Sequence, residues 1–375
     1  MASLENFSFM GMGIPEIIMV LIALLLAYLS IVKKYEPLLL LPLAFGMLIA
    51  NIPLAGLSTY DEGGLIYYLY KGIELGIYPP MIFLCIGAMT DFGPLIASPK
   101  SALIGIGGQL GIFAALVGAL LLSNIIPGME SFTLKEAAAI GIIGSSDGPT
   151  SIYTASVLAP DLLPIITIAA YSYMALVPLI QPPIVKALTT DKERLIEMPN
   201  QKRVSKRSKI IFAFGITIAT LVLVPEAGTL IAMLMLGNLI RESGVTERYV
   251  RTLQNHLLNI LTLLIGLSIG ATATAERILN PKTLLIIILG LFAFALGTVG
   301  GVLVTKLLCF ITGGKINPLI GNSGVSAMPM AARVSQRLGQ EYNPHNHLLM
   351  HAMGPIVSST IGSAIVAGVL ISILG

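Results

Sequence analysis

Charged residues are scarce in this chain. Aspartate, glutamate, lysine and arginine make up only 11% of its 375 residues, whereas hydrophobic residues make up 55%. A soluble domain carries about 25% charged residues, so this chain has too few polar side chains to cover a water-facing surface. The composition excludes an ordinary soluble protein and predicts one that lies mostly in lipid. The net charge of +3 is small and argues against a nucleic-acid partner.

Cysteines and cofactor motifs are also few. The two cysteines, Cys85 and Cys309, each lie inside an apolar run, where a thiol packs as a small hydrophobic side chain. They provide no disulfide framework. The chain has no Walker A motif, so we do not expect ATP to drive it directly. It also has no Met-Lys-Met biotin-attachment sequence, so any biotin would have to be carried by another polypeptide.

The chain consists instead of long apolar runs. Most are candidate membrane-spanning helices, because a crossing needs about 20 predominantly apolar residues. The runs are residues 14–32, 37–57, 79–96, 102–126, 135–158, 161–187, 210–225, 227–240, 255–272, 283–311, 317–332 and 346–374. This pattern predicts an all-α polytopic membrane protein.

Two of these runs are interrupted. Residues 135–158 contain Gly-Ser-Ser-Asp-Gly-Pro-Thr at 144–150, and residues 317–332 contain Asn-Pro, then Gly-Asn-Ser-Gly-Val-Ser at 321–326, then Pro329. Glycine and proline at this density break a helix. Broken backbone at membrane depth survives only where it is buried in protein or lines a cavity. We therefore expect a broken or re-entrant helix in each run.

The two halves of the chain show the same order of features. An Ile-Gly pair, ending at Gly87 or Gly266, is followed by a Pro-Lys pair, a long helix, a broken segment and a final apolar helix. A basic stretch between the halves is cytoplasmic by the positive-inside rule, and an odd number of crossings before it inverts the second half. We predict a first membrane repeat at 1–190, a basic cytoplasmic linker at 191–209 and a second, inverted repeat at 210–375. The broken helices of such repeats meet near the bilayer midplane.

Among the polar residues of the chain, Asp147 in the first interruption is the strongest indication of function. A carboxylate at the bilayer centre costs about 2.5–3.5 kcal/mol on insertion scales, and intramembrane acids mark ion or proton pathways. The hydroxyls of Ser145, Ser146 and Thr150, with freed backbone carbonyls, would complete an oxygen cage for a hard cation. We predict these four residues as cation ligands. The alternative is a buried carboxylate that only caps a helix.

The second interruption offers only neutral oxygens, from Asn317, Asn322, Ser323 and Ser326. If the two breaks enter from opposite sides and meet, one acid with several neutral oxygens suits a monovalent cation better than a divalent one. Turn formation is the alternative role, because asparagine, glycine and serine favour turns in any case.

Two further kinds of side chain are candidates. Tyr171 and Tyr173 lie in the helix after Asp147, where a phenol could donate a hydrogen bond to the carboxylate or carry a proton; packing between helices is the alternative. Arg333 follows the second interruption, and its guanidinium could hold a carboxylate or a planar ureido group. Alternatively, Arg333 only extends to the membrane interface.

Five longer segments of the chain are distinctive. They are Gly-Ile-Ile-Gly-Ser-Ser-Asp-Gly-Pro-Thr at 141–150, Ala-Ala-Tyr-Ser-Tyr-Met-Ala-Leu-Val-Pro-Leu-Ile-Gln-Pro-Pro at 169–183, Gly-Val-Ser-Ala-Met-Pro-Met-Ala-Ala-Arg at 324–333, Asn-Pro-His-Asn at 343–346 and Leu-Leu-Met-His-Ala-Met-Gly-Pro at 348–355. In these segments the chain resembles a known family, the beta subunits of the sodium-translocating, biotin-dependent decarboxylases, which serve oxaloacetate, methylmalonyl-CoA, glutaconyl-CoA and malonate decarboxylases. The resemblance covers nearly the whole chain and is strongest from about 135 to 370.

The resemblance implies roles for individual residues. Asp147 is expected to be the central residue for sodium binding and proton coupling. Tyr173 and Arg333 are expected to act with it, and Arg333 to bind the carboxybiotin cofactor. The resemblance also adds to the sodium ligands, which become Asp147, Ser145, Ser146, Thr150, Asn317, Gly321, Asn322 and Ser326. Many relatives have asparagine where this chain has Ile356, so a backbone carbonyl is expected to replace a side-chain ligand there.

The resemblance also implies partners and a location. The chain is expected to decarboxylate carboxybiotin, which consumes a proton, and to couple this step to sodium export. The expected partners are a biotin carrier protein, a carboxyltransferase alpha subunit, a small gamma or delta membrane subunit and further copies of the chain. The expected location is the inner membrane of a prokaryote. A sodium-coupled secondary transporter of a small organic anion is the alternative function, because repeats and broken helices would also suit it.

Overall fold

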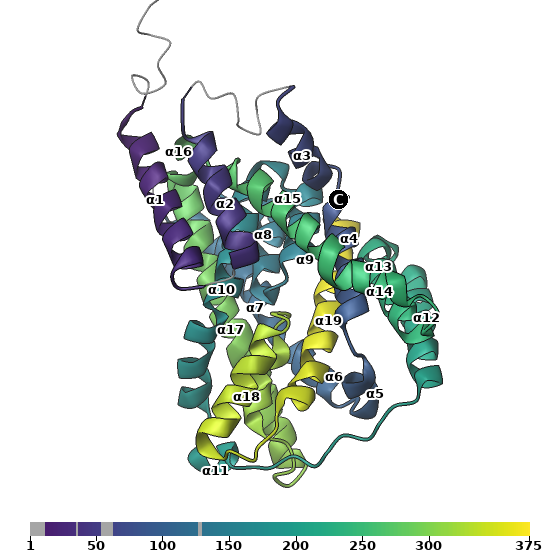
Figure 1. Ribbon diagram of the computed structural model, residues 1–375. Helices are drawn as coiled ribbons and strands as arrows, with labels where there is room; N and C mark the ends of the chain where they lie inside the picture. The colour runs from purple at the N-terminus through teal and green to yellow at the C-terminus, as the bar shows by residue number, and fades with distance from the viewer. Residues whose placement is uncertain (1–11, 35–36, 54–62, 127–129) are drawn as a thin grey trace, which may run out of the picture.

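The computed structural model describes residues 12–34, 37–53, 63–126 and 130–375, and every element within these ranges is helical (Figure 1). Among the described residues, five helices are long and apolar enough to cross a membrane, or up to seven if each bent helix pair is one span. The prediction of an all-α polytopic membrane protein is confirmed.

The apolar runs of the first half form helices close to the predicted positions. The first broken segment begins at a capping box, in which Thr133 and Glu136 each bond the other's backbone N–H and so fix the helix start. The elements are α1 (Ile14–Ile31), α2 (Pro37–Ala50), α3 (Leu65–Glu74), α4 (Tyr78–Met89), α5 (Gly93–Ala97), α6 (Ser101–Gly108), α7 (Leu110–Ile125), α8 (Leu134–Ile142), η3 (Ile143–Ser145), α9 (Gly148–Leu158), η4 (Pro160–Leu162) and α10 (Leu163–Leu188).

The second half also contains a broken segment, which comprises the 3-10 helix η7 and α18. The elements are α11 (Asp191–Arg194), α12 (Lys206–Leu223), η5 (Pro225–Ala227), α13 (Gly228–Ser243), α14 (Glu247–Arg251), the π-helical η6 (Thr252–Leu257), α15 (Leu258–Gly270), α16 (Ala275–Ile278), α17 (Pro281–Ile311), η7 (Pro318–Gly324), α18 (Met330–Tyr342) and α19 (Leu349–Leu374).

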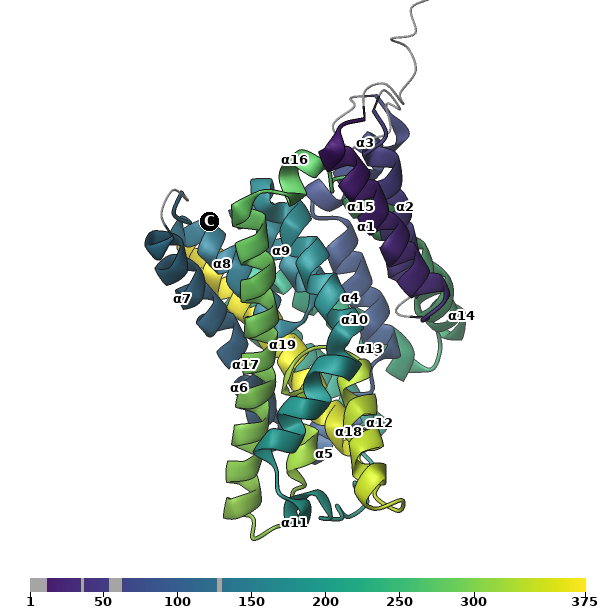
Figure 2. The ribbon, with the colours of Figure 1, turned by 90° about the vertical axis from the view of Figure 1, so that its left-hand side faces the viewer.

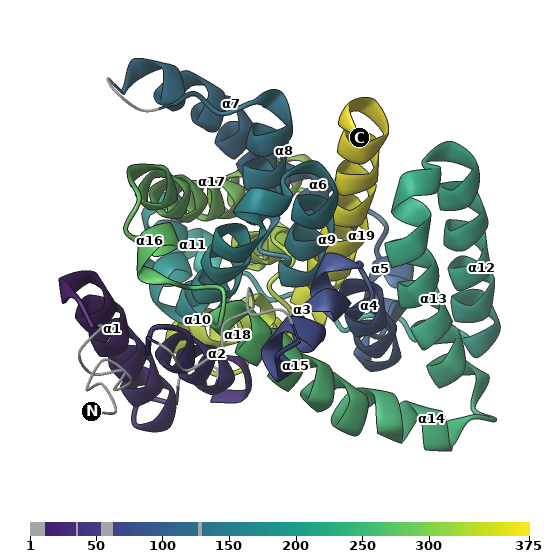
Figure 3. The same ribbon diagram turned by 90° about the horizontal axis from the view of Figure 1, so that it is seen from above.

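The helices form two groups. Seen from above, α1, α2, α15, α14, α13 and α12 follow one another in an arc along the lower and right-hand edges of the view, and α8 and α9 lie inside this arc with α7, α10, α17 and α19 (Figure 3). The long helix α17 runs beside α6, α7 and α10 (Figure 2). The second group therefore surrounds both interruptions with helices.

Helices of the two halves pack in exchanged pairs. Helix α2 packs on α15 while α13 packs on α4, and α10 packs on α17 while α19 packs on α6. Suppose that α2 corresponds to α13, α4 to α15, α10 to α19 and α17 to α6. Replacing each helix by its counterpart then turns the α2–α15 contact into the α13–α4 contact, and the α10–α17 contact into the α19–α6 contact. An inverted repeat predicts this packing, and the repeat and its boundaries at 190 and 210 stay predictions.

Glycines permit the closest of these crossings. A Cβ atom at Gly87 of α4 would lie 1.9 Å from the carbonyl oxygen of Leu234 on α13. A Cβ atom at Gly270 of α15 would lie 2.0 Å from the carbonyl oxygen of Leu43 on α2. Small residues let helix backbones approach closely in a membrane, where van der Waals packing stabilises helix pairs.

Candidate functional site

Asp147 lies at the turning point of the first broken segment. Ser146 ends η3 with a φ of +57°, a conformation that few residues other than glycine adopt, and Asp147 caps the N-terminus of α9. Its Oδ1 accepts a hydrogen bond from the Thr150 backbone N–H at 3.2 Å, and its Oδ2 accepts one from Ser363 Oγ at 2.8 Å. Asp147 is only 4% exposed. The carboxylate is thus buried and caps the N-terminus of α9.

The two broken segments meet beside this carboxylate. The backbone N–H of Ser326, just after η7, donates to the backbone carbonyl of Ser145 at 2.9 Å. Glycine makes the approach possible, because a Cβ atom at Gly108 of α6 would lie 1.8 Å from the carbonyl oxygen of Gly324. The segments, separated by nearly half of the chain, therefore form one joint.

Two of the three hydroxyl oxygens in this turn form no hydrogen bond with any described residue. Ser145 Oγ donates to the Ile142 carbonyl at 2.8 Å. Ser146 Oγ and Thr150 Oγ1, in contrast, are buried and form no hydrogen bond with any described residue. A buried polar atom without a partner costs about 1–3 kcal/mol, and a bound cation would supply the missing interaction. The structure thus brings four of the predicted residues, Ser145, Ser146, Asp147 and Thr150, together with Ser326 of the second segment.

This donor set suits a monovalent cation. In the part of the chain that the structure describes, no group of three or more His, Cys, Asp or Glu side chains gathers that could hold a metal ion. One carboxylate surrounded by hydroxyls and backbone carbonyls balances one positive charge, and hard cations prefer such oxygen ligands.

Asn317 lies at the other end of η7, at the linker. Its Nδ2 donates to the backbone carbonyls of Arg194 and Ile196 at 3.0 and 2.8 Å, and its Oδ1 accepts from the Leu319 N–H at 2.9 Å. Asn317 therefore fixes the start of η7 against the residues that follow α11. The structure does not bring its side chain to Asp147.

Asn322 is fully engaged in a separate buried network. Its Nδ2 donates to Gln181 Oε1 and to the Ala331 carbonyl, each at 2.9 Å, and its backbone carbonyl accepts from Gln181 Nε2 at 2.9 Å. Ser335 Oγ donates to Asn322 Oδ1. Nearby Gly321 packs against α17. These contacts join η7 to α10, α17 and α18, and the sodium-binding roles of Asn322 and Gly321 stay predictions.

The two tyrosines of α10 face different partners. The Tyr173 hydroxyl donates to the backbone carbonyl of Ile287 on α17. The ring of Tyr171 lies against the turn, since a Cβ atom at Gly148 would lie 2.5 Å from Tyr171 Cζ. Tyr171 is therefore the tyrosine next to the Asp147 turn. For Tyr173 to act with Asp147 as predicted, its hydroxyl would first have to break its hydrogen bond to the Ile287 carbonyl.

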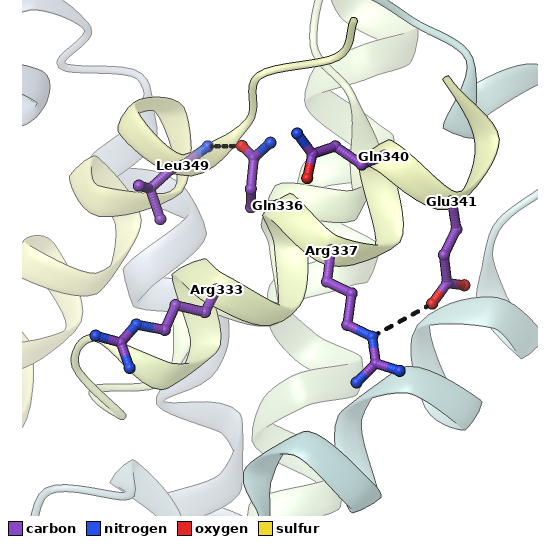
Figure 4. A pocket seen from close by; sticks show the side chains of 6 residues that line it. All are labelled: Arg333, Gln336, Arg337, Gln340, Glu341 and Leu349. Atoms are coloured by element: carbon purple, nitrogen blue, oxygen red, sulfur yellow. Dashed lines mark hydrogen bonds and ion pairs between the residues drawn. The ribbon is translucent and has the colours of Figure 1, made fainter. Parts of the chain in front are cut away.

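Arg333 lines a wide-open surface cavity on the outer face of α18. The cavity has a volume of about 440 Å³ and is lined by Arg333, Gln336, Arg337, Gln340, Glu341 and Leu349 (Figure 4). Arg337 pairs with Glu341 at 3.6 Å, while no ion pair among the described residues involves Arg333, which is exposed. Its guanidinium is available for an anionic or planar group. The cavity is separate from the Asp147 joint.

Sequence reasoning missed two serines of α19 and Gln109. Ser363 donates to Asp147, and Ser359 accepts hydrogen bonds from Ser326 and Gln109. Polar residues four positions apart on an apolar helix share one face, and that spacing could have indicated them. The predicted carbonyl at Ile356 accepts from the Thr360 hydroxyl at 3.0 Å, and the Ile356 side chain is buried in the apolar core.

An ion-pair cluster lies away from the joint, where α12 begins. Lys209 Nζ lies 2.6 Å from Asp91 Oδ1 and 3.4 Å from Glu242 Oε1. Burial raises the pKa of Asp91, but the hydrogen bond and charge of Lys209 and the Gly93 N–H outweigh it and hold that pKa below its usual value. The cluster ties the connection between α4 and α5 to α12 and α13.

Comparisons with known proteins agree over the whole chain. Residues 15–374 match the family model described as Na+-transporting oxaloacetate decarboxylase beta subunit. The chain is 52% identical to methylmalonyl-CoA decarboxylase subunit beta of Propionigenium modestum, over 99% of this chain and 98% of that protein. It is 50% identical to glutaconyl-CoA decarboxylase subunit beta of Acidaminococcus fermentans (99% and 96%) and 48% identical to oxaloacetate decarboxylase beta chain 2 of Salmonella typhi (99% and 98%).

Proposed function

The chain belongs to the family of beta subunits of sodium-transporting decarboxylases, and on that premise we propose that Asp147 is its sodium- and proton-binding residue. The observation that carries the proposal is the burial of this single carboxylate where the two broken segments meet, beside hydroxyls without a protein partner. Sodium would bind Asp147 together with Ser145, Ser146, Thr150 and Ser326. A proton would compete for the same carboxylate.

Sodium export needs an energy source. Moving one charge against 100 mV costs about 2.3 kcal/mol, and the chain has no Walker A motif. Decarboxylation of carboxybiotin supplies the energy in this proposal: the bond between the ureido nitrogen and the carboxyl carbon breaks, CO2 leaves and the nitrogen takes up a proton. A proton that reaches Asp147 or Tyr173 displaces sodium outward and then moves on to that nitrogen.

Carboxybiotin would arrive on a separate subunit. The chain has no biotin-attachment sequence, and the exposed Arg333 beside its cavity is a suitable partner for the carboxylate or the ureido group. We propose a biotin carrier protein, a carboxyltransferase alpha subunit and a small gamma or delta subunit as partners, together with further copies of this chain in the inner membrane of a prokaryote. Family membership favours this function over the alternative sodium-coupled transporter.

Asp147→Asn tests the proposal. We expect loss of sodium-stimulated carboxybiotin decarboxylation, because the neutral amide can neither balance the ion's charge nor exchange a proton. The measurement is the rate against sodium concentration for the purified complex. Asp161→Asn, which alters an exposed acid of the same half, is the matched control and should retain activity. Full sodium-dependent activity in Asp147→Asn would refute the role of Asp147.

A further inference from the structure

A row of buried hydroxyls continues from Asp147 into α19. Asp147 Oδ2 lies 2.8 Å from Ser363 Oγ, which lies 3.5 Å from Ser326 Oγ, and Ser326 Oγ lies 3.1 Å from Ser359 Oγ. The three serines are 7% exposed or less. Ser359 and Ser363 are four residues apart and so share one face of α19. Asp147 therefore faces a third element besides the two broken segments.

The spacing of these oxygens fits a coordination shell. Oxygen ligands lie about 2.3–2.6 Å from a hard cation such as Ca²⁺, which places neighbouring ligands at right angles about 3.3–3.7 Å apart. The contacts between Ser326 and its two partners in α19, at 3.1 and 3.5 Å, are close to that spacing. Because a hydroxyl hydrogen rotates, the lone pairs that now accept hydrogen bonds can turn toward an ion with little movement of the oxygens.

Ser359 differs from an ordinary helix serine in its contacts. The neighbouring Thr360 hydroxyl bonds the carbonyl four residues earlier in its own helix, which is the usual arrangement for hydroxyls in membrane helices. Ser359 Oγ instead accepts from two side chains of other elements, Ser326 at 3.1 Å and Gln109 at 3.2 Å. Its position is set by tertiary contacts.

Gln109 closes the far end of the row. It lies between α6 and α7, is 6% exposed, and its Nε2 donates to Ser359 Oγ, to the Ser359 carbonyl at 3.3 Å and to the Gly105 carbonyl at 3.2 Å. Its Oε1 is buried and has no hydrogen-bond partner among the described residues. A buried amide oxygen in this condition indicates a missing donor or cation.

We propose that Ser359 and Ser363 of α19 are sodium ligands that complete the cradle of Asp147 and Ser326, and that Gln109 is a positioning residue that holds Ser359. The inference rests on the sodium-binding role proposed above for Asp147 and adds two ligands and their support. α19 would then be the third element of the cation site, beside the two broken segments.

Serine-to-alanine substitutions in the complete complex test the inference. We expect Ser359→Ala and Ser363→Ala each to raise the sodium concentration for half-maximal decarboxylation about tenfold, the effect of losing one modest polar interaction. Matched controls are Ser358→Ala, whose hydroxyl bonds the Ala102 carbonyl at 3.0 Å, and Thr360→Val. Both controls should stay within about twofold of the unaltered protein. Equilibrium binding of radioactive sodium gives a second readout that needs no turnover.

Further variants distinguish the loss of a sodium ligand from damage to the fold. Ser359→Thr and Ser363→Thr keep the hydroxyl and should restore sodium affinity, which separates ligand loss from damage to folding. Gln109→Met should raise the half-saturating sodium concentration while the rate at saturating sodium stays within about twofold. If the alanine variants match Ser358→Ala while Asp147→Asn abolishes sodium dependence, the inference is wrong and the role of Asp147 stands. If Asp147→Asn retains sodium dependence, the proposed function itself fails.

Discussion

Single buried amides hold the connections between helices in place. Asn51, 3% exposed, donates to the carbonyls of Met47 at 2.8 Å and Ala273 at 2.7 Å and accepts from the Ala275 N–H at 2.9 Å. Asn238 of α13 makes one such contact at the end of α4, where its Nδ2 donates to the Thr90 carbonyl at 3.0 Å. Each side chain satisfies backbone groups where a helix of the other half ends, which is where such groups lack partners.

Replacing one such amide should cost stability. Asn51→Ala leaves the Ala273 carbonyl and the Ala275 N–H without their partner, which should destabilise the fold by about 1–3 kcal/mol. Thermal unfolding of the detergent-purified protein measures the effect. Asn124→Ala is the control, because Asn124 is exposed and bonds only its own helix. Equal melting temperatures for both variants would contradict a structural role for Asn51.

The meeting of the two broken segments depends on contacts between whole elements. Helix α6 reaches η7 at Gly108, where a Cβ atom would lie 1.8 Å from the Gly324 carbonyl. Backbone cannot move aside as a flexible side chain can, so a methyl group there must separate α6 from η7. Because Ser326 follows η7 directly, its hydrogen bond to Ser145 would be strained by that separation.

Gly108→Ala should therefore reduce sodium-dependent decarboxylation much more than a glycine-to-alanine substitution at a position without close contacts. We expect at least about a tenfold loss, because misplacement by about 1 Å can cost 100-fold in an active site. Gly215→Ala on α12 is the matched control: nothing lies within 4 Å of its added Cβ, and alanine favours a helix by about 1 kcal/mol over glycine. Activity of Gly108→Ala equal to that of the control would exclude the proposed contact.

Across the whole molecule, ion pairs join segments that lie far apart in the chain. Lys209, near the start of α12, faces both Asp91, which follows α4, and Glu242 of α13, and Arg241 lies 3.9 Å from its neighbour Glu242. The Asp91 pKa is lower in the folded protein than its usual value, which is about 3.9 in an unfolded chain. This carboxylate therefore stabilises the fold above the unfolded pKa, and its contribution is lost as pH falls through the folded pKa.

Asp91→Asn should reduce the loss of folding stability that occurs when the pH is lowered. We expect the variant to melt at a lower temperature than the unaltered protein at pH 7, and the difference to shrink as the pH falls below about 4. Melting curves across this pH range measure the effect. Asp161→Asn, at an exposed acid, should follow the unaltered protein. A difference that persists at low pH would show that Asp91 acts by packing and not by charge.

The sequence by itself determined the membrane character, the helix positions and the two interruptions. These properties depend on local composition: apolar length defines a span, and closely spaced glycine and proline end a helix. For the same reason Asp147, inside an interruption, was visible from the sequence. The match between the predicted run 283–311 and α17, which spans Pro281–Ile311, illustrates how far local rules extend.

Only the tertiary structure decided which polar atoms face Asp147. Ser363 lies 216 residues away from Asp147 along the chain, and in the sequence it is one polar residue within a long apolar helix. Asn317, in contrast, lies in the same interruption as Ser326 but forms its hydrogen bonds with the linker. The rotation of each helix about its axis is fixed by packing between distant segments, such as the glycine contact of α6 with η7. Local sequence does not determine that packing. The residues that contact the Asp147 carboxylate are therefore fixed only when the two halves of the chain pack together.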